Sequence, residues 1–202
     1  MNMTKSPNLI LASTSAIRRK LLENAGIKFT ARNSNLDEEN AKIAMRAQQL
    51  SPANQAHELA FMKAKKVSLG NDDFVIGCDQ ILAMDGHVFD KANDMETARE
   101  RLKELRGKAH VLETAIVIAK EGNLVWRYDA SPRLIMRNFS DAFLDDYLIA
   151  AGEKILSSVG CYQLEGHGSQ LFEKIEGDYF SILGLPLLQL LAYLRLHKIA
   201  EI

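Results

Sequence analysis

The chain has 202 residues, of which 47% are hydrophobic, and its 25 basic and 26 acidic residues give a formal net charge of −1. This balance excludes a global positive field that would attract nucleic acid or anionic lipid, although a few local cations could still hold a small anion. The length fits one domain, which we expect to span residues 1–202 as two lobes that do not fold separately.

The cysteine content and the apolar runs exclude further classes. Cys78 and Cys161 are far apart in the sequence and predict neither a disulfide framework nor a zinc ligand set. Residues 1–8 are polar and too short for a signal peptide. No apolar run approaches the roughly 18 residues of a membrane span. We therefore expect a cytoplasmic protein with neither a membrane nor a nucleic-acid partner.

In the first third of the chain, a short strand leads into a capped helix. Residues 8–12 form an apolar run typical of a buried strand, and the hydroxyl residues 13–15 then offer helix N-caps. The helix that follows, 18–25, ends before Gly26, which suits the left-handed position after a helix. The next elements expected are a strand at 29–33 and helices at about 39–49 and 53–68.

The middle of the chain predicts a hairpin and the end predicts further helices. Residues 74–84 read as a strand, and Asp85-Gly86 predicts a tight turn after it. Asp94 is expected to cap a helix that ends near Gly107. The remaining expected elements are a long hairpin of 111–119 and 124–136, a helix at 140–151 and a final amphipathic helix at 185–198. This alternation predicts an α/β or α+β fold whose sheet contains antiparallel pairs.

The stretch LILASTSAIRRKLL at residues 9–22 is the first candidate site. A helix N-terminus exposes unpaired N–H groups and the positive end of the helix dipole, so it suits a phosphate. Arg18 and Arg19 in the first turn conflict with the dipole preference for acids, which suggests that a bound anion supplies negative charge. Simple capping by Ser13 or Ser15, with solvated arginines, is the alternative that the pattern leaves open.

Charged residues cluster at two further places. Three successive acids at 37–39 suit a hard divalent cation, but an acidic first turn of the next helix also explains them. In the helix expected at 53–68, Lys63 is placed at the border of the buried face. Lys65 and Lys66 are instead expected to form a solvated basic face.

The stretch VIGCDQILAMDG at residues 75–86 places Asp79 among apolar residues, at what reads as a strand end. A bare carboxylate in an apolar environment costs free energy unless something pairs with it. Gly77 and Cys78 would let a ligand or another backbone approach closely. Lys91 could form a structural ion pair with Asp79. Alternatively, the acid faces a metal or water on one side and a phosphate-binding lysine on the other.

Taken together, these motifs resemble the Maf family of nucleoside triphosphate pyrophosphatases, which is associated with septum formation and the removal of unusual nucleotides. The family patterns LILAS-x-SPRR-x-LL, D-x-DE, Ala-x-x-Lys-Ala and G-A/S-D-T/Q correspond to LILASTSAIRRKLL, NLDE, AFMKA and GCDQ. The DG-x-x-x-GKP segment corresponds to DGHVFDKAN, and the glycine-rich tail is nearly complete from Gly160 to Leu187. Each motif alone is weak, but six in order along nearly the whole chain are specific.

The resemblance implies an elongated, ITPase-like α/β fold with a mixed sheet and a central cleft between two lobes. It also implies cleavage between the α and β phosphates of a nucleoside triphosphate, which releases the monophosphate and pyrophosphate. A divalent metal cation, Mg²⁺ or Mn²⁺, is the implied cofactor. Members of the family often form dimers, so a homodimer is expected.

The family's site residues carry over to matching positions of this chain. Asp79 would accept the proton of the attacking water, or would hold the metal that activates it, and Glu38 would help to hold that metal. The residues implied to neutralise the triphosphate are Ser13, Arg18, Lys63 and Lys91. Such a set is chemically sensible, because phosphoryl transfer depends mainly on positioning and on cations that counter the developing negative charge.

Three positions in the family set the choice of base, and here they are Ile17, Gln80 and Glu165. Members that resemble a dTTP/UTP pyrophosphatase have Arg, Thr and Gln, whereas those that resemble a 7-methyl-GTP pyrophosphatase have Trp, Gln and Glu. Gln80 and Glu165 favour the second group, since Glu165 could accept hydrogen bonds from the guanine N1–H and amino group. Ile17 lacks the ring that would stack on a positively charged methylated base.

Departures from the family pattern keep other functions open. They are Ala16, Asp90, Ala92 and Ala115. Asp90 adds negative charge beside the lysine expected to contact phosphate, which favours a catalytically weak, nucleotide-binding regulator of cell division as an alternative. A dTTP/UTP-type pyrophosphatase is a second alternative. A third is a hydrolase with Ser13 or Ser15 as nucleophile, although no histidine occupies a motif position.

Overall fold

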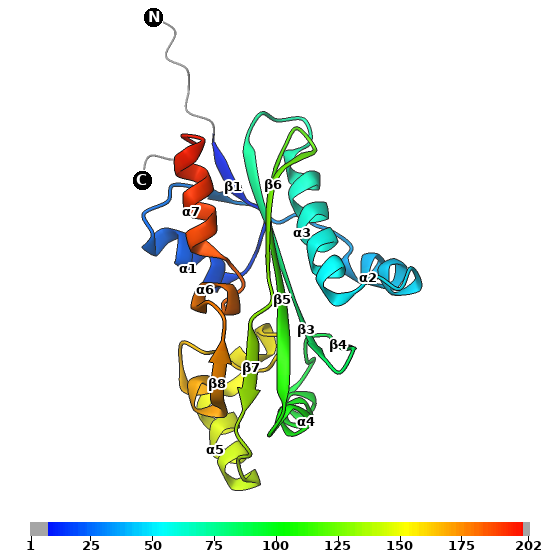
Figure 1. Cartoon of the computed structure of the whole chain (residues 1–202), viewed down its shortest axis with the longest axis vertical. Helices are drawn as coiled ribbons and strands as arrows, with labels where there is room; N and C mark the ends of the chain where they lie inside the picture. Colours follow the sequence, from blue (N-terminus) through cyan, green and yellow to red (C-terminus); the bar gives the residue numbers. More distant parts are fainter. Residues whose placement is uncertain (1–7, 200–202) are drawn as a thin grey trace, which may run out of the picture.

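The computed structural model describes residues 8–199, in which eight strands and seven α-helices form an elongated mixed α/β structure (Figure 1). The strands are β1 (Leu9–Leu11), β2 (Thr30–Ala31), β3 (Phe74–Met84), β4 (His87–Phe89), β5 (Ala109–Lys120), β6 (Asn123–Ala130), β7 (Arg133–Met136) and β8 (Phe172–Glu176). The α-helices are α1 (Ala16–Asn24), α2 (Glu38–Ala47), α3 (Pro52–Ser68), α4 (Met95–Leu105), α5 (Asp141–Ala151), α6 (Tyr179–Ile182) and α7 (Leu187–Leu196). The predicted mixed α/β class is confirmed, whereas most of the segment 1–8, expected not to be a signal peptide, lies outside the described residues.

All the described strands belong to one sheet, in the order β2-β1-β3-β5-β7-β8, with β4 paired to β3 and β6 paired to β5. The two long antiparallel strands β3 and β5 run through both halves of the molecule (Figure 1). At one end they carry the parallel strands β1 and β2, and at the other end they carry β4, β7 and β8. The sheet therefore joins the two halves, and the division into lobes of one domain stays a prediction.

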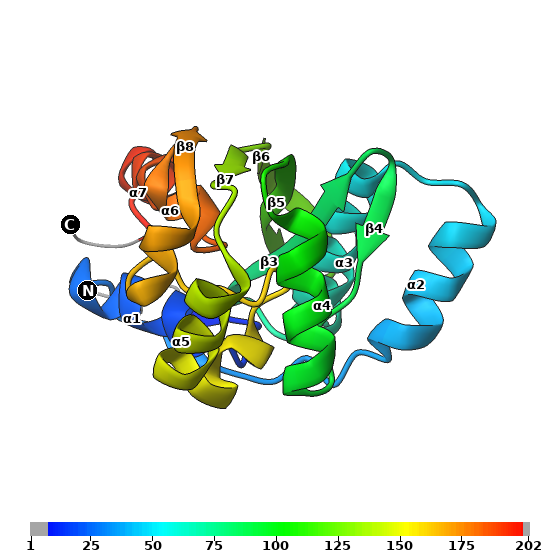
Figure 2. The ribbon, with the colours of Figure 1, turned by 90° about the horizontal axis from the view of Figure 1, so that it is seen from below.

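Three apolar clusters hold the helices against this sheet. One cluster joins α3 to one face of β3 and β5, and a second joins α1 and α7 to the opposite face. Figures 1 and 2 show these helices on either side of the strands. The third cluster lies at the far end, where α4 and α5 cover the ends of β3, β5 and β7. The two ends of the sheet are therefore packed by different apolar clusters.

Local signals in the sequence set most of the helix ends. The side chains of Ser15, Asp94 and Ser140 each accept a hydrogen bond from a backbone N–H in the first turn, as N-caps do. Gly26 has a φ of 72°, the left-handed value expected after α1. The predicted long return strand 124–136 is wrong as a single element, because Ser131 and Pro132 separate β6 from β7. Proline has no N–H to donate to a continuous ladder.

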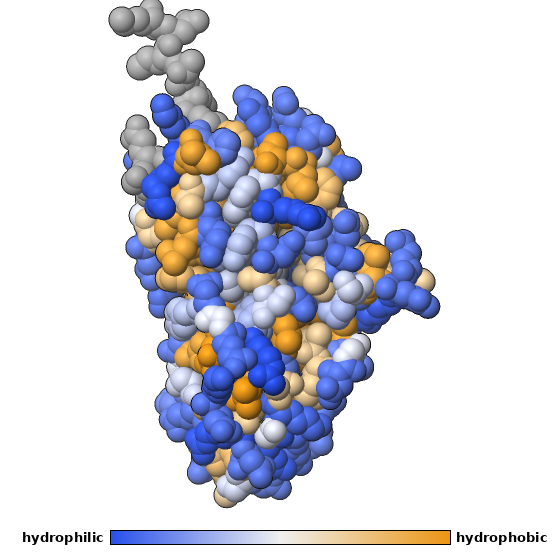
Figure 3. Space-filling view, in the orientation of Figure 1, coloured by the Kyte–Doolittle hydropathy of each residue, from blue (hydrophilic) through white to orange (hydrophobic). Residues whose placement is uncertain are grey.

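Both cysteines are buried and free. Within residues 8–199, no helix combines the length and the apolar character needed to cross a membrane. Exposed large apolar side chains occur on α7 and β6, where Figure 3 shows orange surface among polar residues. They include Leu124, Val125, Leu188 and Leu196.

Gly77 allows α3 to pack closely against the centre of the sheet. A Cβ at this position would lie 2.1 Å from the carbonyl oxygen of Ala60 and 2.8 Å from the Cβ of Ala64. Of the two roles predicted for this glycine, approach by a ligand or by another backbone, the structure therefore shows the second. The close approach brings the last turns of α3 over β3, which positions Lys63 beside Asp79.

We expect the substitution Gly77→Ala to lower the free energy of unfolding by about 2 kcal/mol, because the added methyl group overpacks a rigid contact between α3 and β3. Chemical denaturation of the variant and the parent measures this difference. Gly166→Ala is the matched control, since a Cβ there would meet nothing closer than 3.9 Å. An equal stability of the Gly77 variant and the parent would contradict this account of the packing.

Candidate active site

A cleft of about 710 Å³ lies where the two halves of the molecule meet, as the family resemblance led us to expect. Its size suits a small-molecule ligand such as a nucleotide. All nine predicted site residues line it: Ser13, Ile17, Arg18, Glu38, Lys63, Asp79, Gln80, Lys91 and Glu165. They come from the N-termini of α1 and α2, from α3 and β3, and from the loops after β4 and before the 3-10 helix His167–Leu171. The fold thus brings distant motifs into one cleft.

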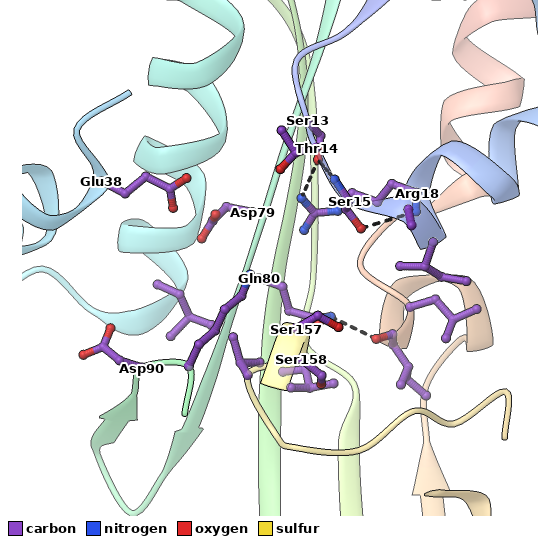
Figure 4. Close-up of a pocket in the computed structure, with 18 of the residues that line it drawn as sticks. Ser13, Thr14, Ser15, Arg18, Glu38, Asp79, Gln80, Asp90, Ser157 and Ser158 are labelled. Atoms are coloured by element: carbon purple, nitrogen blue, oxygen red, sulfur yellow. Dashed lines mark hydrogen bonds between the residues drawn. The ribbon is translucent and has the colours of Figure 1, made fainter. Parts of the chain in front are cut away.

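The centre of the cleft is a chain of opposite charges. The Lys63 Nζ lies 2.7 Å from Asp79 Oδ1 and 3.0 Å from Glu38 Oε1. Asp79 and Lys63 are both buried, each with 8% of its surface exposed. Figure 4 shows the carboxylates of Glu38 and Asp79 pointing toward each other. The ammonium of Lys63 therefore compensates the charge that made Asp79 unusual in an apolar strand.

Asp79 lies in the interior of β3 rather than at a strand end, so that prediction is wrong. Its partner across the ladder is Ala115, one of the departures from the family pattern. Alternation along the strand places Asp79 on the same face as Gly77, which is the face covered by α3. The structural Asp79–Lys91 ion pair that was considered is not formed among the described residues, because Lys63 reaches the carboxylate from α3 instead.

The three acids at 37–39 divide their roles. Asp37 caps α2 and accepts a hydrogen bond of 3.1 Å from the backbone N–H of Asn40. That hydrogen bond lowers the pKa of the Asp37 carboxyl from its usual value. Glu38 instead turns toward Lys63 and the cleft, whereas Glu39 is exposed. The interpretation as an acidic first turn of a helix is therefore confirmed, whereas a divalent cation at these acids stays a prediction.

The loop before α1 is fixed by Arg18. Its Nη1 donates to the Cys78 carbonyl at 2.9 Å and to the Ser13 Oγ at 3.4 Å, and its Nε donates to the Gly184 carbonyl at 2.8 Å. The Ser13 Oγ also accepts from the backbone N–H of Ser15 at 3.2 Å. Figure 4 shows Ser13, Ser15 and Arg18 across the cleft from Glu38 and Asp79. The hydroxyls of Ser13 and Ser15 both accept hydrogen bonds from backbone N–H groups nearby. Among residues 8–199, no histidine lines the cleft that could activate either hydroxyl as a nucleophile.

Lys91 follows β4 and lines the cleft without an ion-pair partner among the described residues. Loss of hydration is the main cause that lowers the pKa of Lys91 from its usual value, and the charge on Arg18 adds to this effect. Lys91 is exposed in the open cleft, so its ammonium can reach a bound anion. The position therefore suits a phosphate group, as the resemblance implies.

The three positions that the resemblance implies for base selection lie away from Asp79. Gln80 points to the face away from Asp79, where its Nε2 lies 2.8 Å from the Thr114 Oγ1 and 3.0 Å from the Ser181 carbonyl. Within residues 8–199 no group donates to its Oε1, which leaves that atom as an acceptor. Ile17 and Glu165 line both the cleft and an adjoining hollow of about 420 Å³. This side can therefore offer both apolar contact and hydrogen bonds.

Two groups of lining residues escaped the sequence predictions. Lys42 and Arg46 of α2 reach the cleft, and their spacing of four and eight residues from Glu38 is a signal that could have found them. The rings of Tyr179 and Phe180 line the adjoining hollow. Their placement depends on how α6 packs, which no local pattern indicates.

The departures from the family pattern have separate structural roles. Asp90 pairs with Lys42 at 3.0 Å and with Arg46 at 2.6 Å, so its charge is compensated by α2. Ala92 is buried in the cluster that includes α4. Ala16 is exposed at the start of α1.

The residues of the cleft fit a divalent cation that binds together with its ligand. Among residues 8–199, no group of three or more His, Cys, Asp or Glu side chains is arranged to hold a metal ion. Two carboxylates, Glu38 and Asp79, do converge there, and Lys63 already places a positive charge between them. Mg²⁺ commonly takes one or two carboxylates and completes its coordination with water and substrate phosphates.

Comparison with known proteins places the chain among enzymes that act on nucleotides. A family model described as "Maf-like protein" matches residues 8–197. A "Nucleoside triphosphate pyrophosphatase" of Granulibacter bethesdensis is 52% identical over 191 residues, which cover 94% of this chain and 97% of that protein. A protein of the same name from Hyphomonas neptunium is 51% identical over 189 residues, covering 94% of this chain and 96% of that protein.

A second group of relatives has a more specific name. A "7-methyl-GTP pyrophosphatase" of Rhizobium meliloti is 48% identical over 190 residues, which cover 94% of this chain and 96% of that protein. The two names occur at nearly equal identity. Overall similarity therefore does not choose between a general and a methylated nucleotide.

Proposed function

The chain belongs to the Maf family, and on this premise we propose that it hydrolyses a nucleoside triphosphate to the monophosphate and pyrophosphate. The names of its close relatives support this reaction. The observation that carries the proposal is the convergence of Asp79, Lys63 and Glu38 in the cleft. A buried acid, a shared lysine and further cations are the groups that the cleavage of a phosphoanhydride requires.

Asp79 is the proposed proton acceptor for the attacking water. Its Oδ1 accepts a hydrogen bond from Lys63, and within residues 8–199 no hydrogen bond to its Oδ2 is formed, which leaves that oxygen available to accept a proton. A fixed carboxylate can orient a water molecule and accept its proton as the new bond to phosphorus forms. Lys63 keeps the acid in one position and compensates its charge before substrate binds.

The cations of the cleft counter the charge of the triphosphate. Lys63 and Lys91 reach the cleft from α3 and from the loop after β4. Arg18 is tied to two backbone carbonyls, and together with Ser13 it forms the other wall of the phosphate site. Because negative charge develops on the departing pyrophosphate, cations placed there lower the barrier.

A divalent cation, Mg²⁺ or Mn²⁺, completes the proposed site, held by Glu38 and Asp79 together with the phosphates of the substrate. When bound, it supplies Lewis-acid stabilisation of the phosphate oxygens. The metal is supported by the chemistry of the two carboxylates and by the family. The predicted homodimer and the cytoplasmic location stay predictions.

We expect 7-methyl-GTP to be among the best substrates in a panel that includes dTTP, UTP and CTP, because Gln80 and Glu165 match the 7-methyl-GTP type of the family. The measurement is pyrophosphate release by the purified chain.

The substitution Glu165→Gln should lower the kcat/KM for 7-methyl-GTP relative to that for dTTP and UTP by about tenfold, since the carboxylate no longer pairs with two donors of guanine. Glu173→Gln on β8, an exposed position outside the cleft, is the control.

The outcome of the panel also tests the alternatives. If 7-methyl-GTP is not among the best substrates while dTTP and UTP are, the role given to Gln80 and Glu165 is wrong and the dTTP/UTP type is correct. If triphosphates raise the melting temperature but none is cleaved with any divalent metal, the chain is a nucleotide-binding regulator. The pairing of Asp90 with Lys42 and Arg46 weakens the case for that regulator, because it compensates the charge that motivated it.

A further inference from the structure

One face of α2 presents a line of charged side chains to the cleft. Glu38, Lys42 and Arg46 are spaced four residues apart, so they lie above one another on the same side of the helix. All three line the cleft. The same face of α2 therefore presents Glu38, which pairs with Lys63, and two cations that none of the family motifs includes.

Asp90 occupies the space in front of these two cations. One carboxylate oxygen lies 3.0 Å from Lys42 Nζ and the other lies 2.6 Å from Arg46 Nη2. The backbone carbonyl of Asp90 accepts a 2.8 Å hydrogen bond from Arg101, which fixes the loop from which the side chain extends. Figure 4 shows Asp90 on the same side of the cleft as Glu38. The acid thus pairs with both cations at the edge of the site and offsets part of their charge.

The ion pairs of Asp90 with Lys42 and Arg46 are weak enough for another anion to displace the carboxylate. The side chains of Asp90 and Arg46 are 46% and 40% exposed, and such half-exposed ion pairs contribute little stability. Met45 is the single buried residue of α2, and the helix stands out from the rest of the molecule in Figures 1 and 2. A phosphate group carries more charge and more acceptor oxygens than a carboxylate, so it can displace Asp90 from the arginine and the lysine.

We propose that Lys42 and Arg46 form the subsite for the terminal phosphates, and that Asp90 occupies this subsite as an internal anion until substrate or pyrophosphate replaces it. The proposal rests on the proposed function and extends it to residues outside the family motifs. Asp90 stands where the family pattern has glycine, and glycine has no side chain that could compete in this way. The competition between Asp90 and phosphate sets how tightly the chain binds pyrophosphate.

Calorimetric binding of inorganic pyrophosphate to the full chain, with and without Mg²⁺, tests the proposal. We expect Asp90→Asn to bind pyrophosphate roughly threefold to tenfold more tightly, because both cations become available. The double variant Lys42→Gln/Arg46→Gln should bind about tenfold more weakly. Adding Asp90→Asn to that double variant should give no gain. Asp72→Asn, which breaks a 2.7 Å surface pair with Lys120 outside the cleft, is the control.

An equal gain from Asp90→Asn in both backgrounds would overturn the proposal, since the effect would then be general charge rather than competition for two cations. Unchanged pyrophosphate binding in the Asp90→Asn variant would also overturn the proposal. Melting temperatures close to the parent value verify that the variants fold. The single Lys42→Gln variant should also bind pyrophosphate more weakly than the parent, which tests the same subsite with one substitution. Binding requires no turnover, so a chain that follows this pattern but cleaves no nucleotide would refute the reaction and leave the subsite standing.

Discussion

Replacing Asp79 with asparagine should lower pyrophosphate release by about a hundredfold to ten-thousandfold, the range that a lost general base commonly costs. The carboxylate is the one acidic side chain on β3 that meets the cleft. An amide oxygen can still accept the hydrogen bond from Lys63, but the amide cannot take a proton from water. Steady-state kinetics with the best substrate of the nucleotide panel measures the loss.

The fold should survive this substitution because asparagine has nearly the same volume as aspartate. A melting temperature within a few degrees of the parent verifies this directly. Asp85→Asn is the matched control, since Asp85 follows the same strand, is exposed, and has a φ of 52° that asparagine tolerates. Turnover by the Asp79 variant at the rate of that control would remove the basis for the proposed mechanism.

The substitution Lys63→Met should cost both activity and stability. It removes the ammonium that lies 2.7 Å from Asp79 and 3.0 Å from Glu38, which leaves two carboxylates near each other, one of them buried. Breaking a buried pair from one side typically costs about 3 kcal/mol. We expect kcat/KM to fall at least about a hundredfold, because a cation of the phosphate site is lost as well.

Lys65→Met separates this effect from a general loss of positive charge on α3. Lys65 is two residues further along the helix and is exposed, so its substitution should change neither turnover nor denaturant stability appreciably. Urea denaturation and steady-state kinetics of both variants are the measurements. If the two variants behave alike, the ammonium of Lys63 does not have the central role that the geometry gives it.

Motifs and local signals carried most of the information about the family and the elements. The bounds of β3 agree with the predicted 74–84, and Ser15 and Asp94 cap helices as expected. These signals succeed because capping, turn formation and strand alternation depend on residues within a few positions of each other. The nine predicted site residues were chosen in the same way, through short motifs, and the structure brings all of them to one cleft.

The tertiary structure alone decided which charges pair. Asp79 pairs with Lys63 rather than Lys91 because Gly77 lets α3 pack close to β3, a contact between residues far apart in the chain. Asp90 meets Lys42 and Arg46 because α2 passes the loop after β4. A side chain's charge and reach are properties of its own residue, but its partner depends on how helices and strands pack, and no local pattern contains that information.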